Sequence, residues 1–148
     1  MQVLRISDCD DRGHLSVDLK ELLSIVTQQG PELSWVLQHL HVSGDLGKGW
    51  SVQTFEQATR QDPFGLRLTW PELLYFAERM TQVQEGLIIG LPPSSNPPSI
   101  SESPVDCGAF VIFEAVDSSY WEVHSLDQEL LRKIRSRFRN VTAVPPEQ

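Results

Sequence analysis

The clearest pattern of apolar and polar positions in the chain lies in residues 105–139. An apolar, β-prone run spans 108–116, Asp and Ser follow at 117–119, and a second short β-prone run spans 120–124. Asp and Ser favour a tight turn because their side chains hydrogen-bond the local backbone. Apolar residues then recur at helical spacing, at Leu126, Leu130, Ile134 and Phe138. The pattern predicts a strand, a turn, a second strand and a helix that is capped by Ser125.

The preceding part of the chain alternates between helical and strand patterns. Capping-box patterns begin at Asp18 and Thr69, each with a Glu three residues later, and each is followed by apolar residues at helical spacing. Residues 51–60 have a weaker helical pattern. Strand-like runs cover 3–6, 35–42 and 86–91. We therefore expect helices interspersed with the strands of one sheet.

Two segments are predicted to lie outside the regular elements. Residues 92–104 are rich in Pro and Ser, and Pro cannot continue a helix or an interior strand because it lacks a backbone N–H donor. We expect a mobile loop at 92–104 and a frayed tail at 141–148. The length of 148 residues suits a single α+β domain over 1–148. Its sheet is expected to be small and mainly antiparallel, with about four or five strands packed against about three or four helices.

The charge of the chain is unevenly distributed. The formal net charge is −8, yet five of the 12 basic residues lie in 132–139, where there is no acidic residue. That leaves seven basic and 20 acidic residues elsewhere, a formal charge of −13. An acidic surface argues against general nucleic-acid binding, which depends on neutralising phosphates, and it suits a basic protein partner.

Neither a membrane segment nor a covalent framework is predicted. The longest apolar runs are about strand length, short of the roughly 20 residues that span a bilayer, and the first residues have no signal-peptide pattern. Cys9 and Cys107 lack the spacing of a zinc or redox motif. Two free thiols indicate a reducing cytoplasm, and no cofactor is expected.

The first candidate for chemistry is the pair His39 and His41. Residues two apart on a strand point to the same side, so both imidazoles could bind one metal ion, with Asp45 as a third ligand. His14 or His124 could add a further ligand. The alternative, which so short a pattern favours, is a pair of surface histidines on the polar side of a half-buried strand.

Other catalytic patterns are incomplete. The glycine-rich loop at 44–49 lacks the spacing of a phosphate-binding loop, and no serine lies in a nucleophile elbow. Glu114 and Glu122 could meet across the predicted hairpin, depending on its register, either as a solvent-facing pair or as a glycosidase-like dyad. No catalytic residue is predicted.

A partner could bind at two places in the C-terminal segment. Tyr120 and Trp121 point to opposite faces of a strand, so one of them is expected to be exposed as an anchor. Arg132, Arg135 and Arg139 share a helical face and could contact phosphate or an acidic partner. The alternative for these arginines is favourable placement near the helix C-terminus, with pairing to acidic residues of the same chain.

No motif identifies a family, so function rests on these patterns. The leading hypothesis is a non-enzymatic, acidic protein-interaction domain, for example an immunity- or antitoxin-type protein that occludes a basic partner. The first alternative is a metal-dependent hydrolase that uses His39, His41 and Asp45. The second is a small-molecule-binding domain with a cleft beside the 92–104 loop, walled by Trp121 or Trp50.

Overall fold

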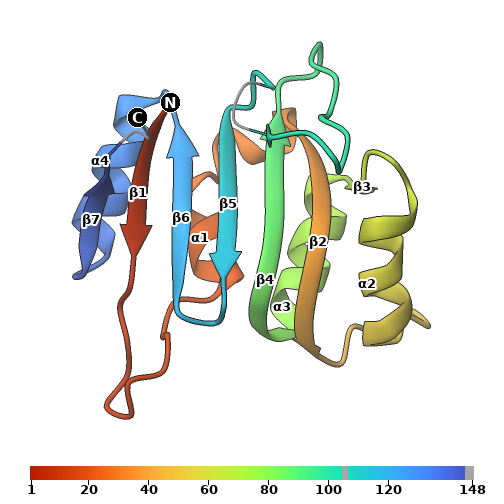
Figure 1. The fold of residues 1–148 in the computed structure, drawn as a ribbon, viewed down its shortest axis with the longest axis horizontal. Helices are drawn as coiled ribbons and strands as arrows, with labels where there is room; N and C mark the ends of the chain where they lie inside the picture. Colours follow the sequence, from red (N-terminus) through yellow and green to blue (C-terminus); the bar gives the residue numbers. More distant parts are fainter. Residues whose placement is uncertain (105–106, 146–148) are drawn as a thin grey trace.

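The computed structural model describes residues 1–104 and 107–145. The first two residues of the predicted C-terminal unit and the last three of the predicted tail lie outside these ranges. In the described ranges the chain forms an open seven-stranded sheet in the order β3-β2-β4-β5-β6-β1-β7, with every neighbouring pair antiparallel (Figure 1). The strands are β1 (Gln2–Ile6), β2 (Ser34–Gly44), β3 (Leu66–Leu68), β4 (Met80–Leu91), β5 (Val111–Val116), β6 (Tyr120–Ser125) and β7 (Val141–Val144).

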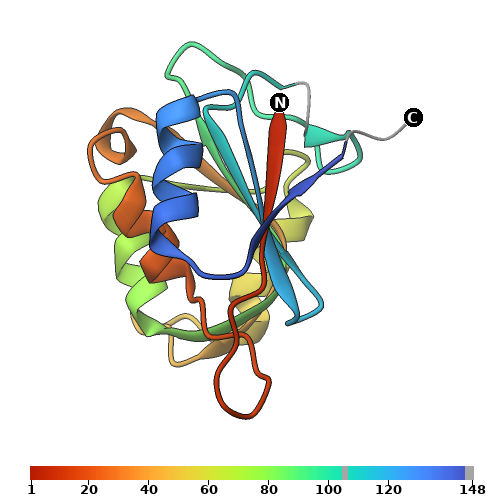
Figure 2. The same cartoon turned by 90° about the vertical axis from the view of Figure 1, so that its left-hand side faces the viewer.

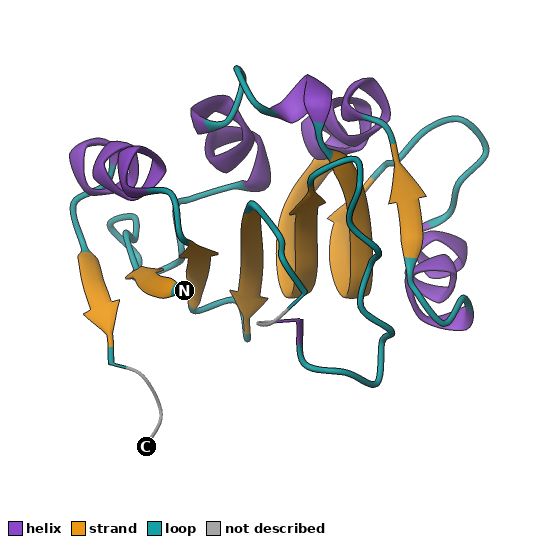
Figure 3. Cartoon of the chain, turned by 90° about the horizontal axis from the view of Figure 1, so that it is seen from above, coloured by secondary structure: helices purple, strands orange, loops and turns teal. Residues whose placement is uncertain are grey.

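The helices of the described ranges are α1 (Leu19–Ile25), α2 (Val52–Gln61), α3 (Trp70–Arg79) and α4 (Gln128–Arg137), with a short 3-10 helix, η1 (Gly30–Glu32). Figures 2 and 3 show α1, α3 and α4 on one side of the sheet. None of the helices in these ranges is long and apolar enough to cross a membrane. The α+β class is therefore confirmed, as is the C-terminal unit of strand, turn, strand and helix.

The sheet has more strands than the four or five predicted. The tail predicted to fray at 141–148 contains β7, which pairs with β1 from Ile6↔Val141 to Val3↔Val144. The other additional strand, β3, has three residues and pairs with the start of β2. Both strands are short, and their pairing partners lie far away in sequence, so local hydrophobic patterns carry no signal for them.

Helix α2 covers the part of β2 that β3 leaves unpaired. The Thr59 hydroxyl accepts a hydrogen bond from the Leu40 amide at 3.1 Å, and the Glu56 carboxylate accepts one from the Val42 amide at 2.8 Å. Side chains of α2 thus satisfy backbone donors at this sheet edge, which would otherwise be open to pairing with another chain.

The main core lies between the sheet and the helices. Its largest fully buried side chains are aromatic: Trp35, Trp121, Phe55 and Phe113. The two fully buried indoles have their N–H groups satisfied, since Trp35 donates to the carbonyl of Gly30 at 3.0 Å and Trp121 donates to that of Val17 at 2.9 Å. Burial of these rings and of the surrounding aliphatic side chains fixes the helices onto one face.

The loop at 92–104 crosses the opposite face of the sheet (Figure 3). A second, smaller apolar cluster lies on that face and includes Val36, Ile89 and Ile112. The loop is attached to β2 and to the α2–β3 turn: the Gln38 amide group donates to the carbonyl of Pro98 at 2.8 Å, and the Ile100 amide donates to that of Pro63 at 2.7 Å.

Helix caps are mostly where the sequence predicts them. The capping boxes of α1, at Asp18 and Glu21, and of α3, at Thr69 and Glu72, are both formed. The predicted cap of α4 is two residues too early. Ser125 is the last residue of β6, its hydroxyl donates to the carbonyl of Phe110 at 2.7 Å, and α4 begins after Asp127.

Candidate functional site

The two predicted metal-binding histidines make separate contacts, and a bulge in β2 lies between them. The pairing of β2 with β4 shifts register between Gln38 and His41, and His39 has a left-handed backbone with φ of 57°. A bulge of this kind breaks the two-residue alternation of a strand. The His39 ring lies against the 92–104 loop instead, with Nε2 3.0 Å from the carbonyl oxygen of Ile100.

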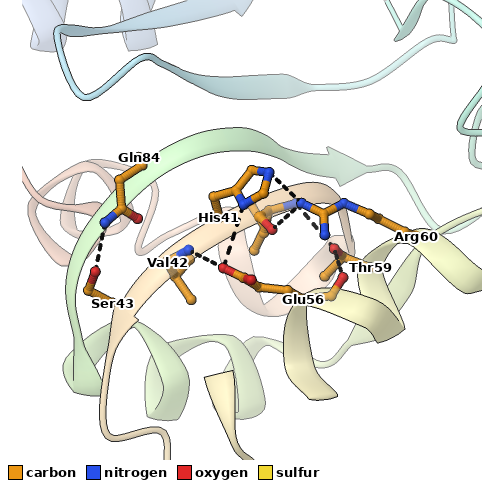
Figure 4. A network of polar contacts seen from close by, with 8 residues as sticks. His41, Val42, Ser43, Glu56, Thr59, Arg60 and Gln84 are labelled. Carbon is orange, nitrogen blue, oxygen red and sulfur yellow. Dashed lines mark hydrogen bonds and ion pairs between the residues drawn. The ribbon is translucent and has the colours of Figure 1, made fainter. Parts of the chain in front are cut away.

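His41 belongs to a separate polar network that joins β2 to α2 (Figure 4). Its Nε2 is 2.6 Å from the Arg60 guanidinium, and its Nδ1 is 3.8 Å from the Glu56 carboxylate. Because a guanidinium can only donate, Nε2 of His41 accepts and Nδ1 carries the hydrogen that faces Glu56. The lone pair that would bind a metal is therefore already engaged.

The third predicted ligand, Asp45, is exposed just after the end of β2. His39, His41 and Asp45 do not form a group with convergent ligand atoms. Within 1–104 and 107–145, the group of three that does so consists of other residues on β5 and β6. The metal-dependent hydrolase built on the predicted set thus has no geometric support.

The register of the β5–β6 hairpin decides which aromatic residue is exposed. Trp121 is 1% exposed and lies in the core, so it is not available to a partner in this fold. Tyr120 is half-buried on the opposite face, where the Arg5 guanidinium lies 4.1 Å from the centre of its ring. Of the two, only Tyr120 retains some exposed surface, and its role as an anchor for a partner stays a prediction.

The two tryptophans that were predicted to form the walls of a small-molecule cleft pack in or against the helix-side core. Trp50 packs against the helix-side core, with its ring centre 5.6 Å from that of Phe55 and 6.3 Å from that of Phe76. Trp121 lies in the same core. Since the 92–104 loop covers the other face of the sheet, neither indole is placed to form a cleft beside it.

The basic segment borders a groove between two helices. The groove has a volume of about 550 Å³. We call it the α1–α4 groove and define it by its lining residues: Ser24, Ile25, Glu129, Arg132, Lys133, Ser136 and Arg137. Its α4 residues follow the spacing i, i+3, i+4, i+7 and i+8, so they form one continuous helical face.

The three arginines that were predicted to share one helical face lie in different surroundings. Arg132 lines the groove, but Arg135 does not. Helix α4 ends at Arg137, and Phe138 has an extended backbone, so Arg139 lies beyond the helix, where its amide donates to the Asp8 carboxylate at 2.9 Å. The other basic residues that line the groove are Lys133 and Arg137. Helical spacing at i+4 as well as i+3 would have found them.

The basic side chains of this segment have no ion-pair partner in the ranges that the structure describes. Among the residues that the structure describes, none of the five basic side chains in 132–139 lies within 4.0 Å of an acidic group as an ion pair. The predicted pairing with acidic residues of the same chain is therefore absent there. Placement near the helix C-terminus does hold for Arg135 and Arg137, which lie in the last turn of α4.

The basic side chains in the lining of the groove are suited to binding an anion. Guanidinium and ammonium groups bind carboxylate or phosphate oxygens strongly. The Ser136 hydroxyl donates to the carbonyl of Arg132 at 3.1 Å, and the lining contains no histidine that could activate a nucleophile. No protein-family model, no curated protein and no solved structure matches the chain. The function must therefore be inferred from this geometry.

Proposed function

We propose that the chain is a non-enzymatic protein-interaction domain whose α1–α4 groove binds an acidic segment of a partner protein. The observation that carries the proposal is the set of Arg132, Lys133 and Arg137. These side chains line one groove and have no ion-pair partner among the described residues, in a chain of net charge −8.

The arrangement of the charges supports binding over solubility alone. Like charges at i,i+4 on a helix, such as Lys133 and Arg137, destabilise it by about 0.2–0.5 kcal/mol per pair, and Glu129, four residues before Lys133, offsets only part of this repulsion. In a chain of net charge −8, clustered basic residues are not required for solubility, so solubility alone does not explain this repulsion. Carboxylates of a partner would remove it, and the planar guanidinium groups would hold them with directional hydrogen bonds.

Peptide binding to charge-reversed variants tests the proposal. We expect a short Glu-rich peptide to bind the wild-type chain with an affinity that falls as ionic strength rises. The double variant Arg132→Glu/Arg137→Glu should bind about tenfold more weakly or worse, because each attraction becomes a repulsion. Isothermal titration calorimetry measures both effects.

The matched control reverses two exposed arginines that do not line the groove. Arg12 lies in the loop after β1, and Arg67 lies in β3 at the other edge of the sheet. The variant Arg12→Glu/Arg67→Glu has the same net charge as the groove variant and should bind the peptide nearly as well as the wild type. Equal loss in the two variants would mean that net charge alone, and not the groove, attracts the peptide.

An immunity-type role remains the second proposal, because the chain outside the basic segment carries a formal charge of −13. In that role the acidic surface would occlude a basic enzyme. The two proposals predict opposite responses to the groove variant. Reversing Arg132 and Arg137 should strengthen association with a basic partner and weaken association with an acidic one.

A further inference from the structure

The face of the sheet opposite the helices carries two glutamates directly across from each other. Glu114 on β5 pairs with Glu122 on β6 in the hairpin register. Trp121 and Val123 are buried in the helix-side core, so alternation along β6 places Glu122 and His124 together on the opposite face. The pairing that the sequence left open is thus formed, with a histidine beside it.

The side chains of Glu114, Glu122 and His124 converge. One ligand atom from each lies within 4.8 Å of the others, and Nε2 of His124 is 3.5 Å from Oε1 of Glu114. His124 and Glu122 are largely buried, with 12% and 15% of their side chains exposed, whereas Glu114 is 38% exposed. The cluster is therefore anchored in the sheet and open to solvent on one side.

The imidazole is the unexplained part of this cluster. Both ring nitrogens of His124 are buried, and neither has a hydrogen-bond partner in the described part of the chain. Buried polar atoms without a partner are uncommon in folded proteins and require an explanation. The two carboxylates add to the problem, because like charges directly opposite each other destabilise a strand pair. A bound cation would give one of the two ring nitrogens a partner and would offset the repulsion between the carboxylates.

The observed spacing fits ligands of one ion. A separation of 3.5 Å between Nε2 of His124 and Oε1 of Glu114 is longer than an ordinary hydrogen bond. Two atoms that each lie about 2.1 Å from one tetrahedral ion are about 3.4 Å apart. The histidine and the first carboxylate are therefore spaced as two ligands of the same metal.

Arg5 positions the second carboxylate. Its guanidinium contacts only Oε2 of Glu122, with Nη2 at 2.8 Å and Nε at 3.2 Å, which leaves Oε1 available. The guanidinium is itself held over the Tyr120 ring. Hydrogen-bonded carboxylate ligands of this kind are a regular feature of metal sites, where the outer partner orients the ligand.

We propose that Glu114, Glu122 and His124 bind a divalent first-row transition metal, with Zn²⁺ as the best fit to one imidazole and two carboxylates. Zinc accepts nitrogen and oxygen ligands at tetrahedral geometry, and three protein ligands leave one position for water. The site is separate from the α1–α4 groove and does not depend on its function. A metal bound at this site would differ from the expectation, drawn from the sequence, that the chain has no cofactor.

Metal titration of the full chain tests this site. We expect one Zn²⁺ per chain by calorimetry, and a tetrahedral absorption spectrum when Co²⁺ is used in its place. Replacing His124 by Ala should weaken Zn²⁺ binding about 100-fold, and Glu114→Gln should also weaken it strongly. Glu114→Gln keeps the shape of an exposed side chain, so it remains informative where His124→Ala disturbs the fold. Arg5→Ala should weaken binding about 10- to 100-fold.

The matched control is His41→Ala, which removes an imidazole that lies outside the cluster. It should bind Zn²⁺ as the wild type does. A wild-type chain that binds no stoichiometric Zn²⁺ at micromolar concentration would overturn the proposal, and would leave an imidazolium–carboxylate ion pair as the role of His124. Unchanged binding in Glu114→Gln, or loss of binding in His41→Ala, would overturn it equally.

Discussion

Single residues determine where the sheet departs from regular pairing. Gly86 on β4 has a φ of 134°, a conformation that side chains rarely adopt, and it lies beside the β2 bulge. A Cβ at this position would lie 2.9 Å from the Cα of Leu40 and 3.2 Å from the carbonyl oxygen of Gln38. The bulge that separates His39 from His41 therefore depends on a glycine in the neighbouring strand.

Replacing Gly86 by Ala should lower the free energy of unfolding by about 2 kcal/mol or more, because strain and overlap act together. Urea denaturation measures the loss. Gly13→Ala is the control, since Gly13 also has a positive φ but a Cβ added there would meet no atom within 4 Å. A Gly86→Ala loss no larger than that of the control would show that the contact with β2 is unimportant.

At the scale of elements, the cap of α3 makes stability depend on pH. The Thr69 amide donates a hydrogen bond to the Glu72 carboxylate at 2.9 Å. This bond, with a further one from the Thr69 side chain, lowers the pKa of Glu72 below its ordinary value. The pKa of Glu72 is lower in the folded chain than in the unfolded chain. The ionised carboxylate therefore stabilises the fold fully at pH values above its unfolded pKa, and this stabilisation is lost as the pH falls through its folded pKa.

The stability difference between the wild type and Glu72→Gln should therefore be largest near neutral pH and should shrink as pH falls below about 4.3. Thermal or urea unfolding at several pH values measures this difference. A difference that stays constant across the acidic range would contradict a role for the ionised carboxylate in the cap.

The attachment of the 92–104 loop rests largely on Gln38, a 1% exposed polar side chain. Its amide nitrogen donates to Pro98 at 2.8 Å and to Phe64 at 3.3 Å. Gln38→Ala should lower the free energy of unfolding by about 1–3 kcal/mol, since it leaves the buried carbonyl of Pro98 without this donor. It should also speed hydrogen exchange at the Ile100 amide.

Hydrogen exchange followed by NMR compares this variant with Gln84→Ala, whose amide nitrogen donates to Ser43 instead of to the loop. Exchange at Ile100 should change only in Gln38→Ala. Rapid exchange at Ile100 in the wild type would instead support the mobile loop that the sequence predicts.

Local signals are sufficient for part of the fold and of the site. The caps at Asp18 and Thr69 and the β5–β6–α4 unit follow from residues close together in sequence. The pairing of β7 with β1 does not, because its residues are more than 130 positions apart. The bulge at His39 and the facing of Glu114 and Glu122 depend on strand register, which hydrophobic alternation alone leaves open.

At the scale of the whole molecule, the sheet separates two surfaces with different chemistry. The α1–α4 groove lies on the helix side, and the cluster of Glu114, Glu122 and His124 lies on the other face. The groove presents basic groups that have no ion-pair partner among the described residues, whereas the cluster presents carboxylates and an imidazole. Under the two proposals, an acidic segment and a metal ion would therefore bind independently.

A two-dimensional NMR titration of the wild-type chain with a Glu-rich peptide tests the proposed function most directly. It reports which amides sense the ligand without any substitution. Binding in the α1–α4 groove predicts saturable shifts concentrated at Ser24, Ile25 and residues 129–137, and weakened by salt. Shifts absent at saturating peptide, or scattered over the chain with no concentration on α1 and α4, would contradict it.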